Sequence, residues 1–454
     1  MTAQQTARSA APSGSGLGLR RRPGRWLEGW DPEDTAQWES EGRAIARVNL
    51  RWSIFCEFLG FVVWQLWSIV AVQLPAAGFD LTSSQVFWLI SVPSLVGATL
   101  RIPYTFMVPL FGGRNWTTIS ALLLLIPAVG LAVAVSDPGT PFGALLLLAA
   151  VAGFGGGNFA SSMANITLFY PAREKGWALG LNAAGGNVGA AVAQLVVPIA
   201  ISIGAVATLN LPLAGLVWVP LILLAAWGAR RFMHNIADAH GDVAGSLAAL
   251  REPHLWVMSF LYVGTFGSFI GFSAVFPKLI ADVFPAFSTF AVAGAALSLS
   301  FLGPLVGSLS RPWGGKMADR FGGAAMTTTA FLVMAALALA VVLTLPVANF
   351  WLFLALFLVL FVASGFGNGA TYKMIPTIFA VRGRTREASA ALGLISAVGA
   401  YGGFLVPQVL NLSASTTGSY DGAFFGFVAT YVVMTAVVVT VYLRPGSRFA
   451  KAGV

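Results

Sequence analysis

Residues 101–113 read RIPYTFMVPLFGG, and residues 311–323 read RPWGGKMADRFGG. Each stretch begins with an arginine inside an apolar run and carries Phe-Gly-Gly ten residues later, and Arg101 and Arg311 are 210 residues apart. Two further matches occur at nearly the same spacing: Gly153-Phe154-Gly155 with Gly365-Phe366-Gly367, and Ala178-Leu179-Gly180-Leu181 with Ala391-Leu392-Gly393-Leu394. Self-similarity of this kind predicts a chain built from two similar halves.

The composition places both halves in a membrane. Of the 454 residues, 57% are hydrophobic and only 9% are charged, whereas an ordinary soluble domain carries about 25% charged residues. A helix needs about 20 apolar residues to cross a bilayer, which leaves room for about twelve crossings. We predict an all-α membrane protein with spans at residues 52–74, 84–111, 116–136, 141–169, 177–204, 211–232, 254–277, 288–312, 325–346, 350–373, 388–410 and 422–443.

Basic residues predict the orientation. The formal net charge is +9, and outside the predicted spans the Lys and Arg residues lie in the even-numbered loops and the tails, except for Lys278 in an odd-numbered loop. This positive-inside pattern predicts an inner-membrane protein with both termini in the cytoplasm. Because it accounts for the positive charge, we expect no nucleic-acid partner. The predicted parts are a cytoplasmic tail with a short helix (1–50), a six-helix bundle (51–232), a cytoplasmic linker (233–253), a second six-helix bundle (254–443) and a cytoplasmic tail (444–454).

The N-terminal tail is expected to be disordered to about residue 25, because it is rich in Ser, Ala, Gly and Arg. Asp31 can then cap a short helix with Pro32 in its first turn. Trp38, Ile45 and Val48 are expected to rest on the membrane surface, and a fully solvated tail is the alternative. No apolar core directly follows the arginines of the tail, so we expect no cleaved signal peptide.

Enzymatic chemistry is not expected. Cys56 is the only cysteine, and His234, His240 and His254 lie outside the predicted spans. An intrachain disulfide and a Cys-based zinc cluster are therefore excluded. The spans also lack a nucleophile with a base and a pair of carboxylates. We expect neither a metal nor a cofactor.

Arg101 and Arg311 are the residues that indicate a function. An arginine at the bilayer centre costs about 2.5–3.5 kcal/mol on insertion scales, so it normally faces a cavity and serves the movement of a substrate or ion. Two arginines at repeat-equivalent positions should meet midway across the membrane, and Glu57, the only carboxylate in the predicted spans, cannot pair with both. The guanidinium fork suits a small flat oxyanion, so we predict a bound anion.

Eight glycines are predicted to let helices pack closely. They are Gly153, Gly157, Gly185, Gly186, Gly365, Gly369, Gly402 and Gly403. A phosphate-binding loop is not expected, because no strand precedes these glycines and no Gly-Lys-Ser/Thr follows them.

Residues 314–323, which we place in the loop after span eight, resemble the Gly-x-x-x-Asp-Arg-x-Gly signature of the major facilitator superfamily. The plan of that superfamily is two parallel six-helix repeats joined by a cytoplasmic linker. The resemblance implies that Lys316, Asp319 and Arg320 help to latch the inner face. The corresponding residues 107–114 keep the glycines and Arg114 but lack the Asp-Arg pair.

Longer motifs resemble the nitrate/nitrite porter family within that superfamily. They comprise Gly155 to Ile166, Leu100 to Pro109, Gly264 to Ser273, Gly365 to Gly369 and Gly402-Gly403, and the likeness covers about residues 30–445. It implies a monomeric carrier of nitrate and nitrite in the lipid bilayer. The implied site has Arg101 and Arg311 gripping the anion, Phe159 and Phe266 enclosing its plane, and Asn187 and Tyr262 adding hydrogen bonds. Aromatic walls favour such a weakly hydrated monoanion over phosphate.

Two coupling schemes stay open. Two uncompensated arginines should hinder reorientation of an empty cavity, which favours exchange of nitrate for nitrite. Proton symport needs a titratable group, for which Glu57 and Lys373 are the candidates. Lys373 equally fits a role in helix packing, in snorkelling to the interface or in pairing with Glu57.

Two other functions are weaker interpretations. A carrier of organic or phosphorylated anions should have more basic residues and hydroxyls in its cavity. A membrane nitrate sensor should have an output domain, for which the tails at residues 1–50 and 444–454 are too short.

Overall fold

The computed structural model describes residues 18–203, 209–239, 248–292 and 295–454. In these ranges, eleven helical segments are long and apolar enough to cross a membrane. The remaining crossing is α14 (Leu302–Phe321), which carries charged side chains along its second half. The protein is therefore a multi-pass membrane protein of twelve crossings, six in each half of the chain.

The first six crossings use both continuous and broken helices. They are α2 (Arg43–Gln73); α3 (Ser83–Phe111); α4 (Gly113–Leu123) with α5 (Leu125–Ala134); α6 (Phe142–Val151) with α7 (Gly153–Phe169); α8 (Ala172–Ser202); and α9 (Leu213–Leu216) with α10 (Val219–Phe232).

The second six crossings follow the same plan. They are α12 (Pro253–Tyr262) and α13 (Ser268–Val283), joined by a π-helical turn at Val263–Gly267; α14; α15 (Gly323–Thr344); α16 (Phe350–Val381); α17 (Ala388–Ala400) with α18 (Gly402–Thr417); and α19 (Asp421–Val441). A short helix, α20 (Arg448–Lys451), lies near the C-terminus.

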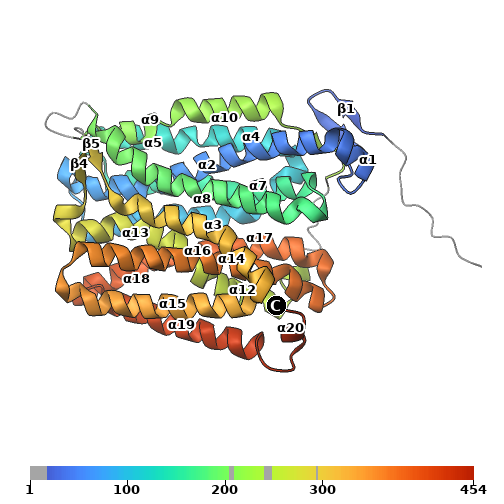
Figure 1. Cartoon of the computed structure of the whole chain (residues 1–454). Coiled ribbons are helices and arrows are strands. Elements are labelled where there is room, and N and C mark those ends of the chain that lie inside the picture. Colours follow the sequence, from blue (N-terminus) through green and yellow to red (C-terminus); the bar gives the residue numbers. More distant parts are fainter. Residues whose placement is uncertain (1–17, 204–208, 240–247, 293–294) are drawn as a thin grey trace, which may run out of the picture.

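The helices run side by side, with the blue-to-green first half packed along the yellow-to-red second half (Figure 1). One end of the molecule carries β1 and the C-terminus, and we call it the terminal face. The opposite end carries the hairpin of β4 (Phe290–Val292) and β5 (Ala295–Leu297), and we call it the far face.

The prediction for span eight was wrong. Residues 288–312 were expected to cross the membrane, but α14 begins at Leu302 and the apolar residues before it include the β4–β5 hairpin. A short apolar run does not distinguish a strand from a helix, and β5 is fixed by a tertiary contact in which the Ala296 amide donates to Ser202 Oγ at 3.1 Å. Residues 314–321, expected in a loop, form the last turns of α14.

The placement of Lys278 in a loop was also wrong. It lies in the last turns of α13 and donates to both carboxylate oxygens of Asp282 at 2.6 Å. A salt bridge between residues four apart lets the helix continue past the predicted end of the span.

The N-terminal segment is more ordered than expected over its described part. Strand β1 (Arg20–Arg22) pairs antiparallel with β2 (Trp26–Glu28), and β2 pairs parallel with β3 (Asn235–Ile236) after α10. This long-range pairing explains why composition alone did not predict the strands. The predicted disorder of residues 1–17 lies outside the described residues.

The short helix of the N-terminal segment is α1 (Thr35–Gln37), capped by Asp34 instead of Asp31. It continues through a π-helical turn at Trp38–Gly42 into α2. Trp38 and Ile45 are buried among the side chains of Phe169, Tyr170 and their neighbours, not exposed on the membrane surface. The predicted surface position of Trp38 and Ile45 was wrong because apolar side chains of α7 and α8 pack against them. Val48, the third residue of that prediction, is partly exposed.

Candidate functional site

Arg101 lies in α3 and is fully buried. Its Nε donates to the carbonyl of Gly156 in α7 at 3.2 Å, and its Nη1 donates to the carbonyl of Ser396 in α17 at 3.0 Å. Its Nη2 has no hydrogen-bond partner among the described residues. The side chain therefore bridges the two halves and keeps both N–H groups of Nη2 free for a ligand.

Two phenylalanines enclose this guanidinium. Arg101 Cζ lies 4.5 Å from the ring centroid of Phe159 and 5.1 Å from that of Phe266. The two rings are stacked with centroids 6.2 Å apart and planes inclined by 29°. A planar group between two ring faces needs about 7 Å, twice a normal contact distance, so these rings must separate slightly to sandwich an anion.

Arg311 lies in α14 of the other half and is also buried. Its Nη2 donates to the Tyr262 hydroxyl at 3.4 Å, and its Cζ lies 5.6 Å from the ring centroid of Tyr372. Tyr262 in turn stacks on Phe266 at 5.4 Å, so the aromatic rings connect the surroundings of the two arginines. Arg311 Nη1 has no partner, and neither arginine forms an ion pair within the described chain.

Two polar side chains of the first half, Asn187 and Glu57, are also buried. Asn187 in α8 is buried, and its Oδ1 lacks a partner among the described residues. Glu57 in α2 is 1% exposed; Ser162 Oγ and Asn182 Nδ2 donate to its Oε2, the latter at 2.7 Å. Its Oε1 is unpartnered and lies so close to Gly186 that a Cβ there would overlap it. Glu57 thus lies directly beside the helix that carries Asn187.

Lys373 does not pair with Glu57. Its Nζ lies 2.6 Å from Asp319 Oδ1, and both side chains are about half exposed. This ion pair ties α16 to the last turns of α14 at the terminal face. Among the other residues predicted to latch this face, Lys316 is exposed and Arg320 lies over the ring of Phe321.

The eight predicted packing glycines all lie at helix–helix contacts. A Cβ on Gly153 or Gly157 would press on α3, one on Gly185 or Gly186 on α2, one on Gly365 or Gly369 on α14, one on Gly402 on Gly267, and one on Gly403 on Ile270 and Ser94. These glycines bring the helices that carry the site residues together.

Hydrogen bonds between the halves show which end is closed. Within the described residues, six such bonds involve side chains: Thr99–Tyr401, Arg101–Ser396, Gln194–Ser273, Ser202–Ala296, Ser91–Gln408 and Ser84–Asn411. All lie at the depth of the arginines or closer to the far face. The two halves are therefore hydrogen-bonded to each other at the site and between the site and the far face.

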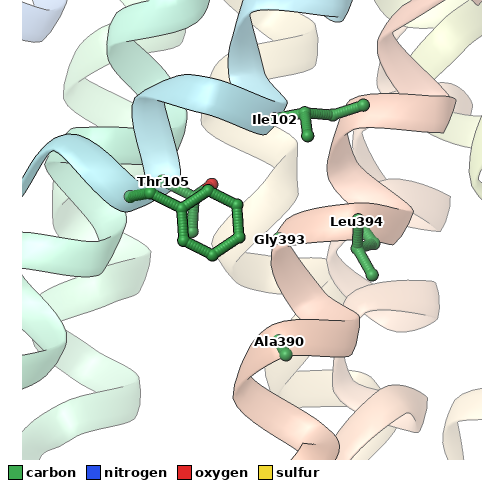
Figure 2. A pocket seen from close by; sticks show the side chains of 6 residues that line it. Ile102, Thr105, Ala390, Gly393 and Leu394 are labelled. Atoms are coloured by element: carbon green, nitrogen blue, oxygen red, sulfur yellow. The ribbon is translucent and has the colours of Figure 1, made fainter. Parts of the chain in front are cut away.

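A recess lies on the other side of Arg101. It is lined by Ile102, Thr105 and Phe106 of α3 and by Ala390, Gly393 and Leu394 of α17. Figure 2 shows the two helices facing each other across this space, with Ala390, Gly393 and Leu394 on α17. The two helices stay close together at this recess, because a Cβ on Gly393 would lie 3.8 Å from Thr105 Oγ1.

Sequence interpretation missed several residues of this site. Trp64 and Tyr372 lie under the two guanidinium groups, Ser162 and Asn182 hold Glu57, and Ser396 supplies a carbonyl to Arg101. The helical period offered one signal, because Trp64 is seven residues after Glu57 and therefore shares its helix face. The carbonyl contact had no sequence signal, because any residue supplies one.

Comparison with known proteins identifies the family. A sequence profile described as the Major Facilitator Superfamily matches residues 54–407. Nitrate/nitrite transporter NarU of Escherichia coli (strain K12) is 42% identical over 451 residues, which cover 92% of this chain and 96% of that protein. The chain belongs to the nitrate/nitrite porter family of the Major Facilitator Superfamily.

A second relative in the porter family and a solved structure of the same fold are also similar to this chain. The probable nitrate/nitrite antiporter NarK2 of Thermus thermophilus is 38% identical over 433 residues, covering 91% of this chain and 95% of that protein. A solved bacterial homolog of the human lysosomal transporter Spinster shares the fold with a TM-score of 0.61, at 18% identity and with 91% of this chain and 96% of that chain covered. The protein is a transporter and not an enzyme.

Proposed function

We propose that this protein carries nitrate and nitrite across the inner membrane of the cell, with one anion held between Arg101 and Arg311. The observation that carries the proposal is a pair of buried guanidinium groups on opposite halves, each with an unpartnered N–H and without an ion pair in the described chain. An anion supplies the missing charge and the missing acceptors. The names of the relatives NarU and NarK2 support nitrate and nitrite as substrates.

The surrounding side chains fit a small planar anion. Phe159 and Phe266 would enclose its plane, Tyr262 would donate its hydroxyl, and Asn187 would donate its amide. Apolar ring faces disfavour a strongly hydrated or doubly charged anion, because they replace none of its water. One chain contributes both arginines, so a monomer is sufficient.

Access would alternate between the two faces. We assign the terminal face to the cytoplasm, because most basic residues lie there. Residues 51–232 and 254–443 would rock as two bodies about the arginines, with residues 233–253 as the linker and Lys316, Asp319 and Arg320 latching the cytoplasmic face. Opening the far face requires the hydrogen bonds on that side of the site to break.

Exchange of nitrate for nitrite is the proposed coupling. Both arginines stay charged when the anion leaves, and an empty site with two free guanidinium groups in low-dielectric surroundings should reorient slowly. A second anion, bound from the other side of the membrane, restores the charge balance and allows the site to reorient back to its first side.

Proton symport is the alternative, and the position of Glu57 favours it. This buried carboxyl group has one unpartnered oxygen next to the helix of Asn187, so a proton could travel with the anion and balance its charge. Lys373 is a weaker candidate because its ammonium group already has a partner in Asp319.

Uptake into liposomes tests the proposal. Purified protein would be reconstituted with nitrite, nitrate, chloride or no anion inside, and nitrate uptake would be followed with and without an inward proton gradient. Exchange predicts uptake that requires internal nitrite or nitrate and ignores the gradient. Uptake into empty, acid-outside liposomes that is lost in Glu57→Gln would establish symport instead, and folded protein that takes up neither anion would contradict the proposed function.

A further inference from the structure

We infer that Asn368 is a further ligand of the anion site and that it favours nitrate over nitrite. The inference rests on the proposed function and deepens it, because it names a residue that distinguishes the two substrates. Three observations carry it: the position of Asn368 beside Arg311, the helix face on which it lies, and its unpartnered amide.

Asn368 lies where α16 crosses α14 at Arg311. A Cβ on the next residue, Gly369, would overlap the backbone carbonyl of Arg311. In the first half, the carbonyl of Gly156 accepts a hydrogen bond from Arg101 Nε. Gly156 precedes Asn368 by 212 residues, which is also the spacing between Gly153 and Gly365. By this repeat correspondence, Asn368 is placed beside Arg311 as Gly156 is placed beside Arg101. Asn368 differs from Gly156 in having a side chain.

The side chain lies on the helix face that borders the site. Tyr372 follows Asn368 by one turn, and residues four apart on a helix share a face. The guanidinium of Arg311 lies over the ring of Tyr372 at 5.6 Å, and Tyr372 lies 6.0 Å from the ring of Tyr262. The face that carries Asn368 thus borders both Arg311 and Tyr262.

The amide of Asn368 lacks partners. The residue is 1% exposed, and neither its Oδ1 nor its Nδ2 has a hydrogen-bond partner among the described residues. A buried amide without partners is unfavourable, so a native site normally supplies them. Arg311 Nη1, a pure donor, is also unpartnered. Asn368 Oδ1 can accept from Arg311, which leaves Nδ2 as a donor to the anion.

This extra donor distinguishes the two substrates. Nitrate offers three oxygens and nitrite offers two, and the site already has the unpartnered Nη2 of Arg101 and Nη1 of Arg311 beside the donors proposed for Tyr262 and Asn187. An anion with more oxygens can satisfy more of these donors at once, so Asn368 Nδ2 should contribute more to the binding of nitrate than to that of nitrite. A hydrogen bond to a charged group, when lost, weakens binding by about 10-fold or more, and here the loss should fall mainly on nitrate.

Calorimetric titration of the purified full-length protein with nitrate and with nitrite tests the inference. We expect Asn368→Ala to raise the Kd for nitrate about 10-fold and the Kd for nitrite less than about 3-fold. Asn368→Ser keeps a donor and should recover part of the nitrate affinity. Asn158→Ala is the matched control, because Asn158 is also buried with an unpartnered amide but packs against Gly60 in α2; its nitrate-to-nitrite ratio should equal that of the wild type.

Melting temperatures establish that each variant is folded, and Asn368→Ser keeps the test decisive if Asn368→Ala does not fold. An unchanged nitrate-to-nitrite ratio in the folded Asn368 variants, with wild-type protein binding both anions, would overturn this inference and leave the proposed function standing. Folded wild-type protein that binds neither anion would overturn both.

Discussion

The two arginines of the site are held differently. Arg101 donates to two carbonyl groups and lies against Phe159 and Phe266, whereas Arg311 makes one long hydrogen bond to Tyr262. Arg101 is therefore fixed before an anion arrives, and Arg311 has more freedom to adjust to it. This asymmetry gives the two positions different sensitivities to substitution.

Replacing either arginine by lysine should weaken nitrate binding by about 10- to 100-fold, because a hydrogen bond to a charged group contributes about 1.5–3 kcal/mol and an ammonium cannot present the same fork. Arg101→Lys should also lower the melting temperature more than Arg311→Lys, because it loses two carbonyl contacts. Calorimetry and thermal unfolding measure both effects. Equal stability losses with unchanged affinity would show that the arginines are structural.

His234, between β3 and α10, makes the N-terminal segment sensitive to pH. Burial lowers the pKa of this histidine from 6.5 to about 4, and the nearby charges of Arg25, Arg21 and Arg114 act in the same direction. Arg25 also donates to its Nε2 at 2.8 Å, which requires a neutral ring.

Because the folded state holds His234 neutral, the unfolded state binds the extra proton first as the pH falls. Stability should therefore be complete above about pH 6.5 and decline toward pH 4. Melting temperatures at several pH values test this, with His234→Gln expected to flatten the decline below pH 6.5. A wild-type curve as flat as that of the variant would contradict the prediction.

At the scale of elements, glycines set the positions of the site residues. The contact between α14 and α16 passes through Gly369, where a Cβ would overlap the carbonyl of Arg311. A bulkier residue there must push α14, and with it Arg311, away from Tyr262.

Gly369→Ala should therefore destabilise the protein by about 1–3 kcal/mol, the usual effect of overpacking, and should weaken nitrate binding. Gly315→Ala on the facing helix is the control, since the nearest atom to its Cβ would be 3.9 Å away. Thermal unfolding and nitrate titration compare the two variants. A Gly369→Ala protein as stable and as competent in binding as Gly315→Ala would show that this crossing does not position Arg311.

At the scale of the whole molecule, the contacts between the halves are concentrated on the far side of the arginines. Asn411 Nδ2 donates to Ser84 Oγ at 3.1 Å near the far face. Alternating access requires this contact to break in every cycle, whereas contacts within one half can persist.

A short bis-methanethiosulfonate reagent, which crosslinks two thiols through disulfide bonds, should stop nitrate uptake by liposomes when it joins Ser84→Cys to Asn411→Cys in a Cys56→Ala background. A reductant cleaves these disulfides and should restore uptake. The control pair is Thr327→Cys with Thr371→Cys, whose hydroxyls lie 3.2 Å apart within the second half. Uptake that continues through the crosslinked far face would contradict rocking of the two halves.

The sequence by itself determined the membrane class, the two-half plan and eleven of the twelve crossings to within a few residues at most ends. These features depend on apolar length and on repeated motifs, which are local properties of the chain. The same locality explains the error at span eight. There Phe290–Val292 and Ala295–Leu297 form strands, and Ser202 of α8 accepts a hydrogen bond from Ala296.

Only the tertiary structure decided which polar groups have partners. The sequence showed that Arg101, Arg311 and Glu57 are energetically unfavourable inside a membrane. It did not show that Lys373 pairs with Asp319 or that Asn368 has no partner in the described chain. A polar side chain finds its partner across helices that are far apart in the chain. Their crossing points are set by packing of the whole bundle, and no local pattern records them.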